Sequence, residues 1–241
     1  MFTPPYTHPL NLKTALKATG FALLPAADVA ALSGCALTDL QALNPSWARL
    51  GADNYLKDGG KYRSRRHGSC VVSGAEVTSV AHRAHWQPVE YNALHGGMER
   101  WFEPLEDATF SVALCAVLVW LGGLTDHMRS PQTWFTEVHQ FRIDTAGGIG
   151  RPTPEGAHRD GVDLVAVFLV ARERVKGGET RVFEANGPSG QRFTLTEPWS
   201  VMLLDDPRMI HETTPIQPAG EGGYRDTLVV TLRGKAFQDA V

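Results

Sequence analysis

The second half of the chain consists of short runs of β-branched and aromatic residues separated by glycine, proline, asparagine or aspartate. Breaks of this kind are typical of an antiparallel β-barrel, because the intervening residues favour tight turns. After Pro131 the pattern predicts strands at 134–143, 162–172, 179–184, 191–196, 200–204, 210–215 and 224–233. This half of the chain is therefore expected to be mainly β.

The first 130 residues have a different pattern. Residues 10–43 are rich in alanine and leucine at helical spacing, with breaks at Gly20 and Pro25, which predicts two helices. Residues 105–128 are apolar, and their length favours a buried helix over a strand. Residues 44–95 are mixed in composition and are expected to be irregular with short strands. The helices should pack outside the barrel, in an α+β fold.

A chain of 241 residues is long enough for one large core and short for two domains. We therefore expect a single domain over 1–241. Residues 1–130 would form a mainly helical and irregular support, and residues 131–235 would form the β core.

Charge and hydropathy exclude several classes of partner. The net charge of −3 and the pI near 6.3 give no broad attraction for nucleic acid or anionic lipid, so a small-molecule substrate is favoured. The longest apolar run, 110–124, is shorter than the roughly 20 residues that span a bilayer. The N-terminus shows no signal-peptide pattern, and the three cysteines lack CxxC spacing. These features predict a cytoplasmic protein that acts away from the membrane.

A candidate metal site begins at His158 and Asp160, which are two positions apart at the entrance to a predicted strand. Residues at this spacing project to the same side of extended backbone, so both side chains can reach one metal ion. His211 lies 53 residues later at another strand opening and offers a third ligand. Two histidines and one carboxylate leave three open positions, which suits Fe(II). The alternative is that His158 and Asp160 are ordinary loop residues.

A second feature is the alternating strand 224–233, where Arg225 and Thr227 share one face. If that face is inside the barrel, the buried guanidinium requires an anion. A dicarboxylic co-substrate could chelate the metal at one end and pair with Arg225 at the other, with Thr227 donating a hydroxyl hydrogen bond. The alternative places Arg225 on the solvent face beside a surface acid.

These motifs, in this order, resemble the 2-oxoglutarate/Fe(II)-dependent dioxygenase superfamily. The resemblance also includes residues 177–180, and it extends over about 62–234. More narrowly, residues 152–161 and 137–143 resemble the bacterial branch that contains L-isoleucine 4-hydroxylases and related free amino-acid hydroxylases. The likeness is most specific over 154–161.

The resemblance implies a double-stranded β-helix, a jelly-roll of the cupin-like kind, that uses Fe(II), 2-oxoglutarate and O2. Its expected activity is oxidative decarboxylation of 2-oxoglutarate to succinate and CO2, coupled to hydroxylation of an unactivated C–H bond. The implied substrate is a small molecule, with a free L-amino acid such as an aliphatic branched-chain one as the leading candidate. The implied ligands are His158, Asp160 and His211, with Arg225 and Thr227 for the co-substrate.

An amino-acid substrate would need a cation for its carboxylate and an acceptor for its ammonium group. Arg63, in the basic segment 61–67, and Glu155 are the candidates, although both are equally consistent with a solvated surface. His139 is a candidate pocket residue or a structural histidine. Either Glu137, His139 and Phe141 or the alternate residues of that strand face inward, and the sequence does not decide which.

Other functions stay open at this level. The same chemistry could act on another small molecule or on a protein side chain. A non-catalytic barrel that binds metal or ligand in a regulatory or stress-response role is a second class. Nucleic-acid demethylation is disfavoured by the acidic pI. The sequence also leaves open a homodimer, the oxidised carbon, and the choice between hydroxylation and sulfoxidation.

Overall fold

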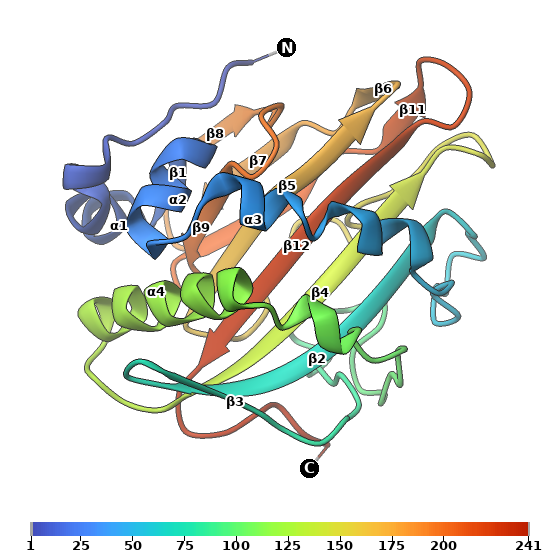
Figure 1. Ribbon diagram of the computed structural model, residues 1–241. Coiled ribbons are helices and arrows are strands. Elements are labelled where there is room, and N and C mark those ends of the chain that lie inside the picture. Colours follow the sequence, from blue (N-terminus) through green and yellow to red (C-terminus); the bar gives the residue numbers. More distant parts are fainter. Residues whose placement is uncertain (1, 241) are drawn as a thin grey trace.

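The largest element of the structure, a computed structural model that describes residues 2–240, is a seven-stranded antiparallel sheet (Figure 1). Its strand order is β1-β9-β5-β12-β4-β2-β3. The strands of this sheet are β1 (Phe21–Leu24), β2 (Arg63–Ser73), β3 (Glu76–Ser79), β4 (Trp134–Asp144), β5 (Leu164–Glu173), β9 (Val201–Asp205) and β12 (Tyr224–Arg233). The alternating run at 224–233 is the central strand β12, which was predicted with these bounds.

Two smaller sheets come from the second half of the chain. One has the order β10-β7-β8, and the other pairs β11 with β6. Their strands are β6 (Val175–Gly177), β7 (Thr180–Glu184), β8 (Gly190–Phe193), β10 (Met209–Thr213) and β11 (Ile216–Pro218). The prediction that residues after Pro131 are mainly β is confirmed.

The N-terminal region contains helices, as expected, and it also contains one strand that was not expected from the sequence. The α-helices are α1 (Leu12–Thr19), α2 (Ala26–Ser33) and α3 (Leu37–Gln41), and short 3-10 helices cover Pro9–Asn11 and Asn44–Arg49. Gly20 ends α1 with φ of 77°, a conformation that glycine adopts without steric cost. The apolar residues that follow form β1, which pairs with β9 at the edge of the large sheet.

The basic segment 61–67 is also different from its expected form. Residues 63–67 belong to β2, an eleven-residue strand next to β4, whereas residues 44–95 were expected to be irregular with short strands. Its alternating charged residues do not form a solvated face, because Arg63, Arg65 and His67 are buried. The strand was not predicted because its inward side chains are charged and face a polar cavity instead of an apolar core.

The main hydrophobic core lies between the helices and one face of the large sheet (Figure 1). Helix α4 (Val112–Met128) buries Leu114, Leu118 and Leu121 there, and β4 contributes Val138. The short 3-10 helix Asp107–Thr109 precedes α4. Because side chains alternate along a strand, the residues on either side of Val138 point to the opposite face of the sheet. The helices therefore support a sheet whose other face is free to carry polar groups.

Within residues 2–240, none of the helices combines the length and the hydropathy needed to cross a lipid bilayer.

The packing of α4 on the sheet leads to a stability prediction. Leu118→Ala removes a fully buried side chain and leaves a cavity, so we expect the free energy of unfolding to fall by about 2–5 kcal/mol. Urea unfolding followed by circular dichroism measures this change. Val112→Ala, on the same helix but 89% exposed, is the control and should change stability by less than about 0.5 kcal/mol. Equal stability losses in the two variants would contradict the assignment of this core.

Candidate active site

The face of the large sheet that points away from the helices forms one wall of a polar cavity. Pairing of β12 with β4 sets Arg225 opposite Ile143, Thr227 opposite Phe141, Val229 opposite His139 and Thr231 opposite Glu137. All eight residues line the cavity. The sequence did not decide which residues of β4 face inward. In the structure they are Glu137, His139 and Phe141.

The other walls come from loops and from the three-stranded sheet. Residues 85–100 and 152–162 contribute from the two long loops, and β10 contributes His211 and Thr213. The cavity has a volume of about 950 Å³ when the space at its opening to solvent is included. A space of this size accommodates two small organic molecules side by side.

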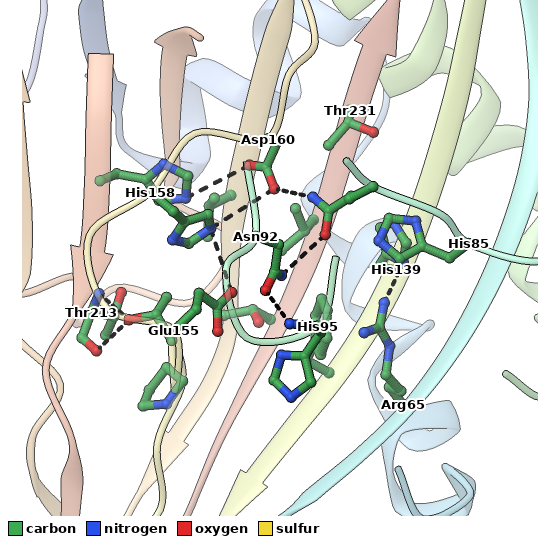
Figure 2. Close-up of a pocket in the computed structure, with 18 of the residues that line it drawn as sticks. Arg65, His85, Asn92, His95, His139, Glu155, His158, Asp160, Thr213 and Thr231 are labelled. Atoms are coloured by element: carbon green, nitrogen blue, oxygen red, sulfur yellow. Dashed lines mark hydrogen bonds and ion pairs between the residues drawn. The ribbon is translucent and has the colours of Figure 1, made fainter. Parts of the chain in front are cut away.

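The structure brings His158, Asp160 and His211 together in this cavity. Their ligand atoms all lie within 4.8 Å of one another. The Nε2 atom of His158 is 3.8 Å from Oδ1 of Asp160, and Nε2 of His211 is 3.9 Å from Oδ2 of the same carboxylate. Reciprocal backbone hydrogen bonds of 3.0 and 2.9 Å join His158 to His211, so the loop and β10 are held in register. In Figure 2, His158 and Asp160 converge on one region of the cavity.

The hydrogen-bonding state of the two histidines suits a metal ion. Nδ1 of His158 lies 2.9 Å from the carbonyl oxygen of Gly156, which can only accept, so the proton is on Nδ1 and the Nε2 lone pair is free. Burial and the neighbouring His158 hold the pKa of His211 well below its usual value, which keeps this imidazole neutral. Burial opposes a charge on His158, but the carboxylates of Asp160 and Glu155 outweigh it and raise the pKa of this imidazole, so a metal ion at its Nε2 would displace a proton. Two imidazoles beside one carboxylate are a donor set for Fe(II).

Asp206 fixes the backbone of the metal loop. Its carboxylate accepts hydrogen bonds from the backbone N–H groups of Asp160, Gly161 and Val162, at 2.9, 2.8 and 3.0 Å. Burial and the charge of Asp160 raise the pKa of Asp206 to about 7, against the effect of these three donors. Asp206 lies directly before Pro207, a combination typical of a turn, and it belongs to none of the sequence motifs described above.

Gln87 orients the side chain of Asp160. Its Nε2 donates to Oδ1 of Asp160 at 3.1 Å, while its Oε1 accepts from Nη2 of Arg100 at 2.9 Å and from Nδ2 of Asn92 at 3.2 Å. Because both ends of the amide are engaged, its orientation is determined. Neither Gln87 nor Arg100 belongs to a motif, so neither could be identified from its sequence context.

Arg225 is buried at 4% exposure and lines the same cavity. No hydrogen bond or ion pair joins its guanidinium to another side chain among residues 2–240. The adjacent Asp226 points elsewhere and forms a two-pronged pair with Arg142, at 2.8 and 2.7 Å. Burial and the nearby Arg172 lower the pKa of Arg225 to about 10, so the group stays charged at neutral pH. This cation is placed to receive an anionic ligand.

A second group of ionisable residues lies on the same wall, where Glu137 is surrounded by His67, His85 and His139. Its carboxylate lies 3.3 Å from Nε2 of His67 and 2.9 Å from Nδ1 of His85. Arg65 lies 2.8 Å from Nδ1 of His139, and because arginine can only donate, the proton of His139 is on Nε2. That Nε2 carries the proton of the ring and lies 3.8 Å from Glu137, beyond hydrogen-bond distance, so it is not available as a metal ligand. The group is best described as a carboxylate surrounded by imidazoles, with His85 in hydrogen-bond contact.

The three residues predicted to contact substrate all line the cavity, and their roles stay predictions. Nε of Arg63 donates to Asp53 at 2.7 Å, so its charge is already paired. His139 is buried and stacks on His67 with ring centroids 4.7 Å apart. Glu155 places Oε1 3.6 Å from Nε2 of His158, and its Oε2 is buried without a hydrogen-bond partner.

The comparisons with known proteins agree with this geometry. The profile of a family described as 2OG-Fe dioxygenase matches residues 44–231. The crystal structure of a BsmA homologue from Methylobium petroleophilum PM1 is 49% identical, with a TM-score of 0.94 over 99% of this chain and 98% of that chain. No curated protein matches the chain.

Two more distant structures share the fold. IDO from Bacillus thuringiensis is 16% identical, with a TM-score of 0.74 over 96% of this chain and 100% of that chain. The Fe(II)/α-ketoglutarate-dependent dioxygenase TqaL is 19% identical, with a TM-score of 0.70 over 93% of this chain and 86% of that chain. At these identities the likeness establishes the arrangement of helices and sheets alone.

The contact between Gln87 and Asp160 leads to a prediction for metal affinity. Gln87→Ala removes the donor that orients the carboxylate, so we expect Fe(II) to bind about 10- to 100-fold more weakly. Anaerobic competition with a coloured chelator measures the dissociation constant. Gln41→Ala, at an exposed position at the end of α3, is the control and should leave it unchanged. An unaltered affinity in Gln87→Ala would show that this amide does not support the site.

Proposed function

The chain belongs to the 2OG-Fe dioxygenase family, and we propose that it hydroxylates a free L-amino acid, with aliphatic branched-chain amino acids as the first candidates. Members of this family use Fe(II), 2-oxoglutarate and O2, so the protein is a 2-oxoglutarate-dependent dioxygenase. Family membership favours an enzyme over the non-catalytic binding barrel. When bound, iron and 2-oxoglutarate would supply an oxidant, whose formation is driven by decarboxylation of the co-substrate.

We assign His158, Asp160 and His211 as the ligands of Fe(II). The assignment is supported by the convergence of their ligand atoms and by the free Nε2 lone pair of His158. It is also supported by the buried Nδ1 of His211, which has no hydrogen-bond partner among the described residues, so the ring depends on Nε2 for its polar contact. Asp206 and Gln87 would keep the carboxylate of Asp160 aimed at the metal.

We assign Arg225 and Thr227 to the distal carboxylate of 2-oxoglutarate. Arg225 is a buried cation with no acid partner among residues 2–240, and Thr227 lies two residues along the same face of β12. A carboxylate would take a two-pronged pair from the guanidinium and a hydrogen bond from the hydroxyl. The observation that carries the proposed function is the presence of the three candidate ligands and Arg225 in one cavity.

The amino-acid substrate is supported by the mixture of charges around the remaining space. Arg63, Arg65 and Arg100 line it together with Glu137 and Glu155. A zwitterion presents one carboxylate and one ammonium group, and it can therefore satisfy cavity groups of both signs. The resemblance to amino-acid hydroxylases in residues 152–161 points in the same direction.

The architecture that we propose for this site is a double-stranded β-helix within a single domain. The seven-stranded and three-stranded sheets both line the cavity, as two facing sheets of a jelly-roll would. Strands β1, β2 and β3 come from the first 130 residues and join the large sheet, which supports one domain over the whole chain. A cytoplasmic location and a homodimer also remain proposals.

The direct test is to incubate the purified protein with Fe(II), 2-oxoglutarate, O2 and each common L-amino acid in turn. We expect at least one amino acid to raise succinate release well above the rate without substrate, with a hydroxylated product detected by mass spectrometry. A panel with no member above that background would contradict the amino-acid substrate. A visible absorption band on anaerobic mixing of Fe(II) and 2-oxoglutarate checks separately that the co-substrate binds the metal.

Removing the carboxylate of the metal site should abolish turnover. Asp160→Ala leaves two imidazoles, which cannot hold Fe(II) with the same charge and geometry. We expect succinate formation to fall to background and the anaerobic absorption band to disappear. Asp163→Ala, three residues along the chain at a side chain that pairs with Arg129, is the control and should retain both signals. Full activity in Asp160→Ala would remove the assignment of this triad.

Removing the guanidinium of Arg225 should act on the co-substrate. Truncating one member of a buried charge pair costs about 2–5 kcal/mol, so Arg225→Ala should raise the KM for 2-oxoglutarate by about 30-fold or more. The Fe(II) dissociation constant should change little, because Arg225 is not one of the proposed ligands. Steady-state kinetics with varied 2-oxoglutarate measure the effect. An unchanged KM would place the distal carboxylate elsewhere.

A further inference from the structure

Arg100 is the second buried cation of the cavity that lacks an acid partner. It is 2% exposed, and its Nε has no hydrogen-bond partner among the described residues. Its Nη2 donates to the neutral amide of Gln87, and no carboxylate within residues 2–240 forms an ion pair with it. Arg225 shows the same pattern on the co-substrate side. Buried guanidinium groups require an anion, so the cavity has places for two.

The other two arginines of this wall are already engaged. Arg63 pairs with Asp53 at 2.7 Å, and Arg65 lies 4.0 Å from the same carboxylate. The Arg65 guanidinium also donates to His139 and lies 3.7 Å from the centroid of the Phe102 ring. Nε of Arg65, like that of Arg100, has no hydrogen-bond partner, but among the described residues Arg100 is the arginine of this group without a carboxylate in ion-pair distance.

Glu155 is a buried acid that lacks a hydrogen-bond donor, whereas Arg100 is a buried cation that lacks an acid. Its Oε2 is a buried acceptor with no hydrogen-bond partner among residues 2–240, and its Oε1 lies 3.6 Å from His158. Oε1 of Glu137 also has no hydrogen-bond partner among the described residues, but it lies 3.3 Å from Nε2 of His67 and 3.5 Å from Nη1 of Arg83, so charged or polar neighbours already surround this carboxylate. Glu155 and Arg100 do not form an ion pair, yet they are close enough for the charge of Glu155 to counteract the burial that lowers the pKa of Arg100 to about 10. A ligand with an acid and an amine at adjacent positions would satisfy both.

Both groups are also connected to the proposed metal ligands. Gln87 bridges Arg100 to Asp160 through hydrogen bonds of 2.9 and 3.1 Å, and Glu155 borders His158 directly. Figure 2 shows Glu155 on the same side of the cavity as His158. A molecule held between Arg100 and Glu155 would therefore lie next to the triad.

We propose that Arg100 and Glu155 are the two ends of a substrate subsite, in which Arg100 binds the carboxylate and Glu155 binds the ammonium group of a free amino acid. The subsite rests on the proposed function and adds the residues that select the substrate class. It requires both charged groups of the ligand. Molecules that lack the carboxylate or carry a blocked amine are excluded, because each would leave one buried charge unpaired.

The test is a binding measurement without turnover, on protein loaded with Fe(II) and 2-oxoglutarate under anaerobic conditions. The probes are the twenty common L-amino acids, followed by the primary amide and the N-acetyl derivative of the one that binds most tightly. We expect isothermal titration to show that each derivative binds at least about thirtyfold more weakly than the free amino acid. Equal affinity of the amino acid and its amide would overturn the carboxylate end, and equal affinity of the N-acetyl derivative would overturn the ammonium end.

Two variants assign these effects to residues. Arg100→Gln should weaken binding of the amino acid at least about thirtyfold and remove the preference over its amide, while the dissociation constant for 2-oxoglutarate stays the same. Glu155→Gln, measured at Fe(II) concentrations that saturate the metal site, should do the same for the preference over the N-acetyl derivative. Arg49→Gln, at an exposed arginine paired with Glu106, is the matched control and should keep both preferences.

The outcomes separate this subsite from the proposed function. If an amino acid binds with these preferences but releases no succinate in air, the subsite stands and the hydroxylase activity falls. If an amino acid is hydroxylated but Arg100→Gln retains its affinity and its preference, the subsite is overturned and the activity stands. If Arg100→Gln does not fold, the comparison of acid and amide on the unaltered protein decides. Failure of every amino acid to bind also overturns the subsite.

Discussion

The site depends on the register of three antiparallel strands, β2, β4 and β12. Their pairing places Arg63, Ile143 and Arg225 in one row across the sheet and His67, His139 and Val229 in another. A shift of one residue would turn every one of these side chains to the face covered by the helices. The apolar residues at intervening positions, which pack against α4 and its neighbours, prevent that shift. The hydrophobic core on one face of the sheet thus determines the chemistry on the other.

The strands of the cavity wall carry buried charges that are paired and buried charges that are not, and the difference indicates their roles. Arg63 pairs with Asp53 at 2.7 Å on the side of the cavity, and Asp226 pairs with Arg142 at the same distance outside it. The guanidinium of Arg225 has no such partner among the described residues. An uncompensated buried charge destabilises the protein, so its presence is best explained by a ligand that completes the pair.

The part of this site that could be predicted from sequence is the part whose residues lie close together along the chain. His158 and Asp160 are two residues apart at a strand entrance, and Arg225 and Thr227 lie on one alternating strand, so local patterns were sufficient to select them. The interior face of β4 needed the pairing with β12, which no local pattern contains.

Other features could not be found in this way. Strand β2 was hidden because its inward residues are charged, and periodicity methods take charge as a sign of exposure. Gln87 and Arg100 lie in long irregular segments, where composition gives no indication of which side chain reaches Asp160. Asp206 looked like a turn residue, and its three backbone hydrogen bonds to the metal loop depend on a contact across more than 40 residues of chain.

Glu137 and Glu155 show how surroundings separate two carboxylates of one cavity. Burial alone would raise the pKa of Glu137, but the neighbouring imidazoles, with His85 the strongest, hold it well below its usual value. This carboxylate is therefore charged, and His67, His85 and Arg83 lie within ion-pair distance of it. Each of the two carboxylates has one buried oxygen without a hydrogen-bond partner among the described residues, but the only ion-pair neighbour of Glu155 in that part of the chain is His158. A cationic group of a ligand would meet Arg83 and the imidazoles at Glu137 and fewer competing groups at Glu155, and this difference directs the ligand to Glu155.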